Sequence, residues 1–240
     1  MFGFFYYDWT ILIVMPAMVF ALWAQFKVKS TFDHFSAVIS RRGYTGAEAA
    51  RRLLDANGLR NVAIMPVDGH LSDHYDPRNK TLYLSSDVYG SRSTAAIGVA
   101  CHEAGHALQD AKSYGPLKLR MSIIPACNLG SKLAIPLFLV GILLASAAAD
   151  PMVGNLFMLL GISAFSLSTL FQLVTLPVEF NASRRAMEGM ASCGILAGDE
   201  LSGARRVLSA AAMTYVAALA TSLLSLLRLI IIASNSSRRR

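Results

Sequence analysis

Four long apolar stretches constrain this chain more than any other feature of its sequence. They cover 9–26, 133–149, 152–176 and 211–233. Each is about as long as a helix needs to be to cross a bilayer, roughly 17 to 25 residues. The first three contain no Asp, Glu, Lys or Arg, and the fourth contains only Arg228. Because hydrocarbon excludes charge, the pattern predicts an integral membrane protein with about four transmembrane helices.

The composition supports this class and excludes others. Apolar residues make up 54% of the chain and charged residues 15%, against roughly 25% charged residues in a typical soluble domain. The same numbers exclude a disordered chain, a coiled coil and a collagen-like fibre. Three cysteines cannot build a disulfide framework, which indicates a reducing compartment for the polar part.

The placement of the basic residues predicts the orientation. Of the 22 Lys and Arg, fourteen lie in 27–132 and four in 177–210. The positive-inside rule puts both segments in the cytoplasm and the N-terminus outside. The three arginines at 238–240 would lie outside, against this rule, if the last apolar run crosses the membrane. The sequence does not decide whether that run crosses. Residues 1–8 contain no Lys or Arg, so we expect an uncleaved anchor rather than a signal peptide.

The polar segment 27–132 has the patterns of a small α+β unit. Thr45 and Glu48 form a capping box ahead of a helix over 47–56, and Asn57 and Gly58 suit a left-handed end. The later elements are expected in this order: a strand over 61–67, a turn-rich loop from Asp68 with 76–79 as its clearest turn, a strand over 81–85, a short helix from Ser86 and a helix over 94–111.

The last of these helices contains the motif H-E-x-x-H at His102, Glu103 and His106. Side chains four residues apart project from one face of a helix, so both imidazoles can reach one zinc ion. Glu103 then lies beside the open coordination position, where it can take a proton from water. The motif predicts a zinc cofactor with Glu103 as the catalytic base.

A catalytic zinc needs a third protein ligand, and the residues alone leave it open. The metzincin arrangement is excluded, because Gln109 and Lys112 occupy the positions of its Gly and third His. Topology removes Asp150, which we expect on the other side of the membrane. Pro177 can begin a new helix, with Glu179 in its first turn. The full set of candidates is Asp110, Asp150, Glu179, Glu188, Asp199, Glu200, His34, His70 and His74.

Three stretches carry a resemblance to a known family: 73–79 (DHYDPRN), 101–107 (CHEAGHA) and 172–183 (QLVTLPVEFNAS). They resemble the YugP-like family of bacterial neutral zinc metallopeptidases, over nearly the whole chain. The arrangement is also similar to that of the gluzincins that include HtpX and the CAAX prenyl proteases. The resemblance implies that His102, His106 and Glu179 are the zinc ligands and that Glu103 is the base.

The chain departs from those relatives at Ser183, where they have Asp. An Asp there would accept a hydrogen bond from a ligand histidine, and a neutral hydroxyl is expected to orient the ring more weakly. Asn181, or an acid elsewhere, is an alternative for that role.

Several other residues are expected to have minor roles. His70 and His74 lie in a loop that is better explained by turn chemistry than by a second metal site. Cys101 is expected to pack against its neighbours rather than to bind metal.

The strand over 81–85 is expected, by analogy with zincins, to be an edge strand that binds extended peptide. Candidates for stabilising the transition state are His74, Tyr75, Tyr83, Tyr89, Tyr114, Arg184 and Arg185.

The sequence therefore predicts a membrane-anchored zinc endopeptidase that cleaves membrane or juxtamembrane polypeptides, with the lipid bilayer and no nucleic acid as partner. The alternatives are a non-catalytic membrane protein with a structural zinc site and an intramembrane protease of the site-2 type. The expected segments are an N-terminal anchor (1–26), a cytoplasmic metallopeptidase unit (27–132), a transmembrane hairpin (133–176), a cytoplasmic helix with the third ligand (177–210) and an apolar helix with a basic tail (211–240).

Overall fold

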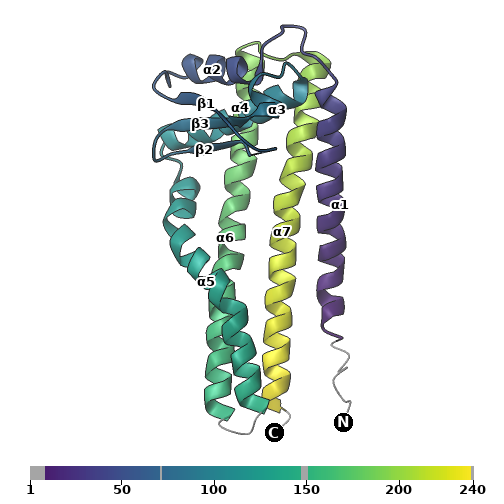
Figure 1. The fold of residues 1–240 in the computed structure, drawn as a ribbon, viewed down its shortest axis with the longest axis vertical. Coiled ribbons are helices and arrows are strands. Elements are labelled where there is room, and N and C mark those ends of the chain that lie inside the picture. Colours follow the sequence, from purple (N-terminus) through teal and green to yellow (C-terminus); the bar gives the residue numbers. More distant parts are fainter. Residues whose placement is uncertain (1–8, 71, 147–150, 239–240) are drawn as a thin grey trace. The chain divides into compact units, whose positions relative to one another are not determined.

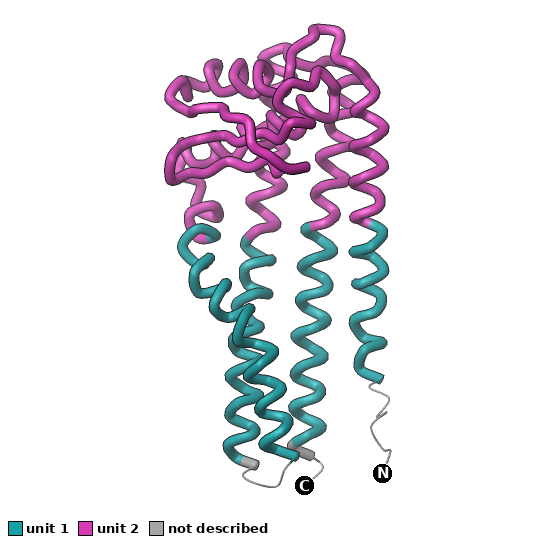
Figure 2. Tube along the Cα trace, in the orientation of Figure 1, with its two compact units in different colours: residues 1–23, 120–174, 215–240 teal, residues 24–119, 175–214 magenta. Residues whose placement is uncertain are grey.

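The structure is a computed structural model that describes residues 9–70, 72–146 and 151–238. Its fold class is α+β, as predicted. The chain divides into two compact units (Figure 2). The first unit comprises 1–23, 120–174 and 215–240, and the second comprises 24–119 and 175–214. Each unit is described by itself.

The first unit is built from apolar portions of four long helices. These are α1 (Ile11–Ser36), α5 (Gly115–Ser146), α6 (Pro151–Ser192) and α7 (Gly198–Arg238). All four are long and apolar enough to cross a membrane, which confirms the prediction of about four transmembrane helices. The expected hairpin turn at Asp150 and the tail residues Arg239 and Arg240 lie outside the described residues.

Small residues let α5 and α6 approach closely in the first unit. A Cβ on Gly141 would lie 2.5 Å from the backbone N of Met158, and a Cβ on Gly161 would lie 2.8 Å from the carbonyl O of Ala134. Such contacts are typical of helix pairs in membranes. Arg228, the single charge in the fourth apolar run, donates from Nε to Thr10 Oγ1 at 3.2 Å.

The second unit contains a three-stranded sheet with helices beside it (Figure 1). Its strands are β1 (Ala63–Val67), β2 (His74–Asp76) and β3 (Thr81–Ser85), and its short helices are α2 (Gly46–Ala56), α3 (Ser86–Tyr89) and α4 (Thr94–Ala111). The strand order is β1-β3-β2, with β1 parallel and β2 antiparallel to β3.

The expectation that the strand over 81–85 is an edge strand was wrong. β3 is the central strand, because β2 forms inside the segment that turn-forming residues marked as a loop. Asp73 fixes this pairing by accepting hydrogen bonds from the backbone N–H of Ser85 at 2.8 Å and from its hydroxyl at 3.1 Å. The free edges of the sheet therefore belong to β1 and β2.

Local signals in the sequence set the ends of α2 as predicted. Thr45 Oγ1 accepts from the Glu48 N–H at 3.2 Å, and Glu48 Oε2 accepts from the Thr45 N–H at 2.8 Å. The left-handed residue after the helix is Gly58, with φ of +78°, whereas Asn57 has φ of −102°. Behind this helix lies a core whose largest fully buried members are Leu53, Leu54, Leu82, Leu84, Ile97, Met190, Ile195 and Leu196.

Candidate metal centre

The helix α4 presents the H-E-x-x-H motif, and its observed bounds are the predicted ones. Ser93 begins it as the N-cap, accepting the Ala96 N–H on its hydroxyl at 3.1 Å. Most of the helix is buried, and small residues on its inner faces allow close packing. Its two histidines are both largely buried, with 14% of the His102 side chain and 11% of the His106 side chain exposed.

A glycine in the motif brings α4 against α6. A Cβ on Gly105 would lie 2.5 Å from the carbonyl O of Ala182, a distance that real Cβ atoms do not adopt. The close approach places His102 and His106 opposite the part of α6 that carries Glu179. Sequence reasoning did not identify this role, although a glycine inside a buried helix is the signal that could have shown it.

The expectation that Pro177 begins a new helix was wrong. α6 is continuous from Pro151 to Ser192, with Pro177 in its interior. A proline removes one backbone hydrogen bond and costs about 3 kcal/mol in a helix interior. The buried face that follows it, with Val178, Ala182 and Met190 all fully buried, stabilises the continuous helix. Glu179 therefore lies on a fixed helical surface rather than in a first turn.

The three predicted metal-binding side chains converge. The donor atoms of His102, His106 and Glu179 all lie within 4.8 Å of one another. Glu179 Oε2 is 3.2 Å from His102 Nε2 and 3.6 Å from His106 Nε2, and only 3% of the Glu179 side chain is exposed. The structure thus brings together residues that are 77 positions apart in the sequence.

The other ring nitrogen of each histidine is engaged by a neutral side chain. His102 Nδ1 lies 3.0 Å from Ser183 Oγ, and His106 Nδ1 lies 3.0 Å from Gln109 Oε1. Ser183 therefore contacts the ring as the Asp of the relatives is expected to do, and Asn181 does not take its place.

Gln109 is fully buried, and its hydrogen bonds fix the tautomer of His106. Its amide nitrogen donates to the Val178 carbonyl at 2.7 Å and to Asn181 Oδ1 at 3.0 Å. Oε1 is therefore the atom that faces His106, and Nδ1 must donate the hydrogen. Asn181 Oδ1 also accepts from Arg185 Nε at 2.7 Å. Sequence reasoning missed Gln109, since a buried amide gives no pattern in a single sequence.

This arrangement fits a divalent cation. With Nδ1 as the donor, a neutral His106 turns the lone pair of Nε2 toward the Glu179 carboxylate, and two acceptors face each other. A proton or a cation between them removes the repulsion. Tetrahedral zinc with bonds of about 2.0 to 2.1 Å sets its donor atoms roughly 3.3 Å apart, and the 3.2 and 3.6 Å separations agree with that.

The electrostatics of the site follow from burial among charges. Burial raises the pKa of the Glu103 carboxyl above its ordinary value, and His106 and His102 counteract part of the rise. Burial acts to lower the pKa of His106, but the carboxylates of Glu179 and Glu103 raise it overall. The pocket thus favours positive charge between these side chains, as a metal site requires.

Six of the remaining ligand candidates have other contacts, and Asp150 lies outside the described residues. Asp110 accepts from the Tyr75 hydroxyl at 2.9 Å, and Glu200 accepts from the Arg41 N–H at 2.6 Å. His70 pairs with Asp87, His74 bonds the Ser72 carbonyl and stacks on Tyr83, Glu188 lies 4.0 Å from Arg184, and His34 contacts the Phe35 ring. In the described part of the chain, the converging group has three members.

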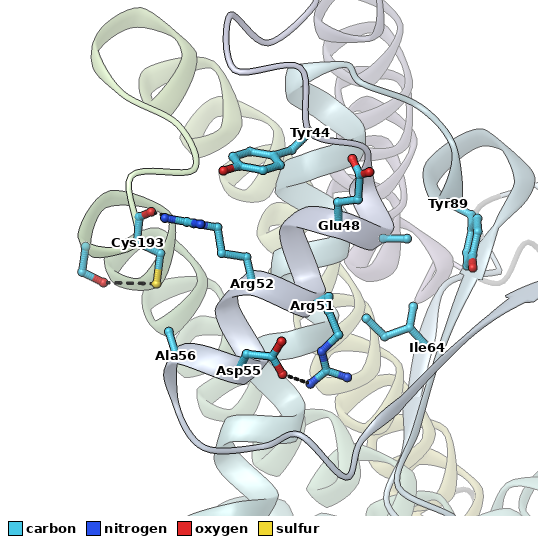
Figure 3. Close-up of a pocket in the computed structure, with 11 residues that line it drawn as sticks. Tyr44, Glu48, Arg51, Arg52, Asp55, Ala56, Ile64, Tyr89 and Cys193 are labelled. Carbon is cyan, nitrogen blue, oxygen red and sulfur yellow. Dashed lines mark hydrogen bonds and ion pairs between the residues drawn. The ribbon is translucent and has the colours of Figure 1, made fainter.

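A separate cavity of about 950 Å³ lies beside α2 (Figure 3). The arginines in its lining bind backbone carbonyls and so stabilise the fold. Arg51 donates to the carbonyls of Leu59 and Val62 and pairs with Asp55 at 2.8 Å. Arg52 donates to the Cys193 carbonyl. None of the three converging side chains lines the cavity, and we assign it no chemistry.

Comparison with known proteins agrees with this geometry. Residues 10–234 match the model of a family described as "Putative neutral zinc metallopeptidase". The chain is 50% identical over 225 residues to the "Putative membrane protease YugP" of Bacillus subtilis (strain 168), covering 94% of this chain and 96% of the relative. No solved structure matches. The chain therefore belongs to the family described as "Putative neutral zinc metallopeptidase".

Proposed function

We propose that the protein is a zinc-dependent endopeptidase in which His102, His106 and Glu179 hold the metal and Glu103 is the general base. The observation that carries the proposal is the convergence of three donor atoms from α4 and α6 within 4.8 Å. When bound, zinc supplies Lewis acidity, which lowers the pKa of water and polarises a carbonyl.

The chain's own residues divide the remaining work. Ser183 and Gln109 hold the two imidazoles with Nε2 facing Glu179, where the metal would be held. Glu103 accepts a proton from the attacking water on its carboxylate and returns it to the leaving amine. Burial of Glu103 raises its pKa, which suits a group that must both take and release a proton near neutral pH.

A structural zinc site is the second candidate, and the donor count disfavours it. A structural zinc is closed by four protein ligands, whereas the converging group contains three among the described residues. An intramembrane mechanism of the site-2 type is disfavoured because α4 is not among the four candidate spans.

We place the catalytic residues on the cytoplasmic side, because the positive-inside rule assigns the segments 27–132 and 177–210 to that side. Glu179 follows the apolar run 152–176 by only three residues. Peptide bonds of membrane or juxtamembrane polypeptides are therefore the substrates that we propose. The sheet edges open to an extended peptide are those of β1 and β2, not β3.

The test compares cells that carry the wild type with cells that carry Glu103→Gln, using proteomics of newly formed peptide termini. The substitution keeps the size of the side chain and removes its basicity. We expect the variant to retain zinc and to lose the termini that the wild type produces. Equal cleavage by both proteins would remove Glu103 from the mechanism.

A further inference from the structure

A groove of about 620 Å³ runs between α6 and α7 within the second unit, and one of its lining residues is Ser183, which also contacts His102. Phe180 and Met187 of α6 and Leu208 and Met213 of α7 form apolar parts of its lining. Arg184 and Arg205, one from each helix, bring two positive charges to the same groove. The groove is therefore largely apolar and carries two basic side chains and one acidic one, Glu188.

The groove lies near the apolar runs of both helices. Only residues 193–197 connect α6 to α7, so the helices run antiparallel along the groove. At one end, both continue into the apolar runs 152–176 and 211–233. At 1.5 Å per residue, Arg184 lies about 12 Å beyond the first run and Arg205 about 9 Å before the second. Both arginines thus lie about two helical turns from the ends of the apolar runs.

The two arginine side chains are available to bind an anionic ligand. Arg205 is exposed and makes no hydrogen bond or ion pair with any residue that the structure describes. Arg184 lies 4.0 Å from Glu188, and both side chains are about 70% exposed, so this pair is weak. The arginines of the cavity beside α2 differ, because their donors already bind backbone carbonyls.

We propose that this groove binds one anionic phospholipid, with its phosphate at Arg184 and Arg205 and an acyl chain against Phe180 and Met213. Guanidinium groups bind phosphate oxygens through paired hydrogen bonds. The walls are helices, whose backbone groups are bonded internally, so they offer an extended peptide no backbone partners. An acyl chain needs none. The proposal does not rest on the proposed peptidase activity, although Ser183 lines the groove and also contacts His102.

The test uses the full-length protein, purified in detergent and equilibrated with an equal mixture of phosphatidylglycerol and phosphatidylcholine. Native mass spectrometry then counts the lipid retained by each protein molecule. We expect one retained phosphatidylglycerol in the wild type. Arg205→Gln should lower its retention about fivefold, equivalent to about 1 kcal/mol for one basic residue at an anionic surface.

Arg206→Gln is the matched control, because Arg206 is exposed, is the next residue on α7 and does not line the groove. It should retain the lipid as the wild type does. Equal loss in Arg205→Gln and Arg206→Gln would mean that only general surface charge attracts the lipid, and would overturn the proposal.

A second variant tests the apolar part while every arginine remains. Ser209 is exposed and lines the groove, and Ser209→Trp should fill it and abolish retention of phosphatidylglycerol. Unchanged retention would contradict the proposal. Inorganic phosphate provides the last arm: if it displaces the lipid at equal concentration, the groove is a phosphate site and the lipid assignment fails. Zinc content, measured for each variant, confirms that the second unit remains folded.

Discussion

Opposite substitutions of Ser183 should change zinc affinity in opposite directions. Its hydroxyl lies 3.0 Å from His102 Nδ1 and is a neutral acceptor for the ring N–H. Ser183→Ala removes the acceptor and leaves a largely buried N–H without a partner. Ser183→Asp supplies a carboxylate acceptor at the same position of α6.

The expected magnitudes follow from the hydrogen bond. A neutral hydrogen bond contributes about 1 kcal/mol net, and one to a charged acceptor is roughly twice as strong. Each change is therefore worth about 1 kcal/mol, or about fivefold in the dissociation constant. This is close to the lower limit of the effects known for groups that support metal-bound histidines, roughly tenfold. We expect weaker zinc binding for Ser183→Ala and tighter binding for Ser183→Asp.

Competition with a chromogenic zinc chelator at fixed pH measures both constants in detergent. Ser209→Ala and Ser209→Asp are matched controls, since Ser209 is exposed on α7 and should leave the zinc constant unchanged. The reasoning is refuted if Ser183→Ala binds zinc as the wild type does, or if Ser183→Asp binds it more weakly than Ser183→Ala.

Three further predictions concern the second unit. Gly105→Ala places a Cβ 2.5 Å from a backbone oxygen of α6 and should lower the free energy of unfolding by about 2 kcal/mol or more. Gly115→Ala is the control, because its Cβ would meet no atom within 4 Å, and it should not lower this free energy. Equal denaturation midpoints for the two variants would contradict the prediction. Burial raises the pKa of Asp73 above 3.8, so the folded state holds a proton that the unfolded chain releases, and stability should fall as pH rises from 3.8 through the raised pKa. Asp73→Asn should flatten that slope in denaturation measured across this pH range, and an unchanged slope would count against it. Burial also raises the pKa of the Cys101 thiol. A maleimide should therefore label the partly exposed Cys193 in the native protein and Cys101 only after unfolding. Labelling of both thiols at equal rates in the native protein would show that Cys101 is not buried.

Strong local signals made much of the second unit predictable. The capping box at Thr45 and the cap at Ser93 fixed the starts of α2 and α4, because a side chain that satisfies a helix N–H acts within three residues. β2 was missed because its three residues lie in a turn-rich segment, and its pairing depends on the distant bonds of Asp73 to Ser85. The prediction that a helix begins at Pro177 was wrong for the same reason. The local cost of the proline is offset by the packing of α6, which the residues next to Pro177 in the sequence do not reveal.

The candidate site was predictable only in part. The spacing of His102 and His106 on one helix follows from helical periodicity, and the structure brings Glu179 to them. The contacts of Ser183 and Gln109 to the two rings required the register between α4 and α6, which the close approach at Gly105 sets. Such a register depends on packing between distant segments, and a single sequence does not encode it in any local pattern.

Zinc content is the most direct measure of the central claim that α4 and α6 together hold one metal ion. Glu179→Ala should lose most of the zinc that the purified wild type retains after dialysis against a weak chelator. Glu188→Ala, an exposed carboxylate on the same helix, should keep about one zinc per chain. If Glu179→Ala retains zinc with the affinity of the wild type, Glu179 is not a ligand and the proposed centre is wrong.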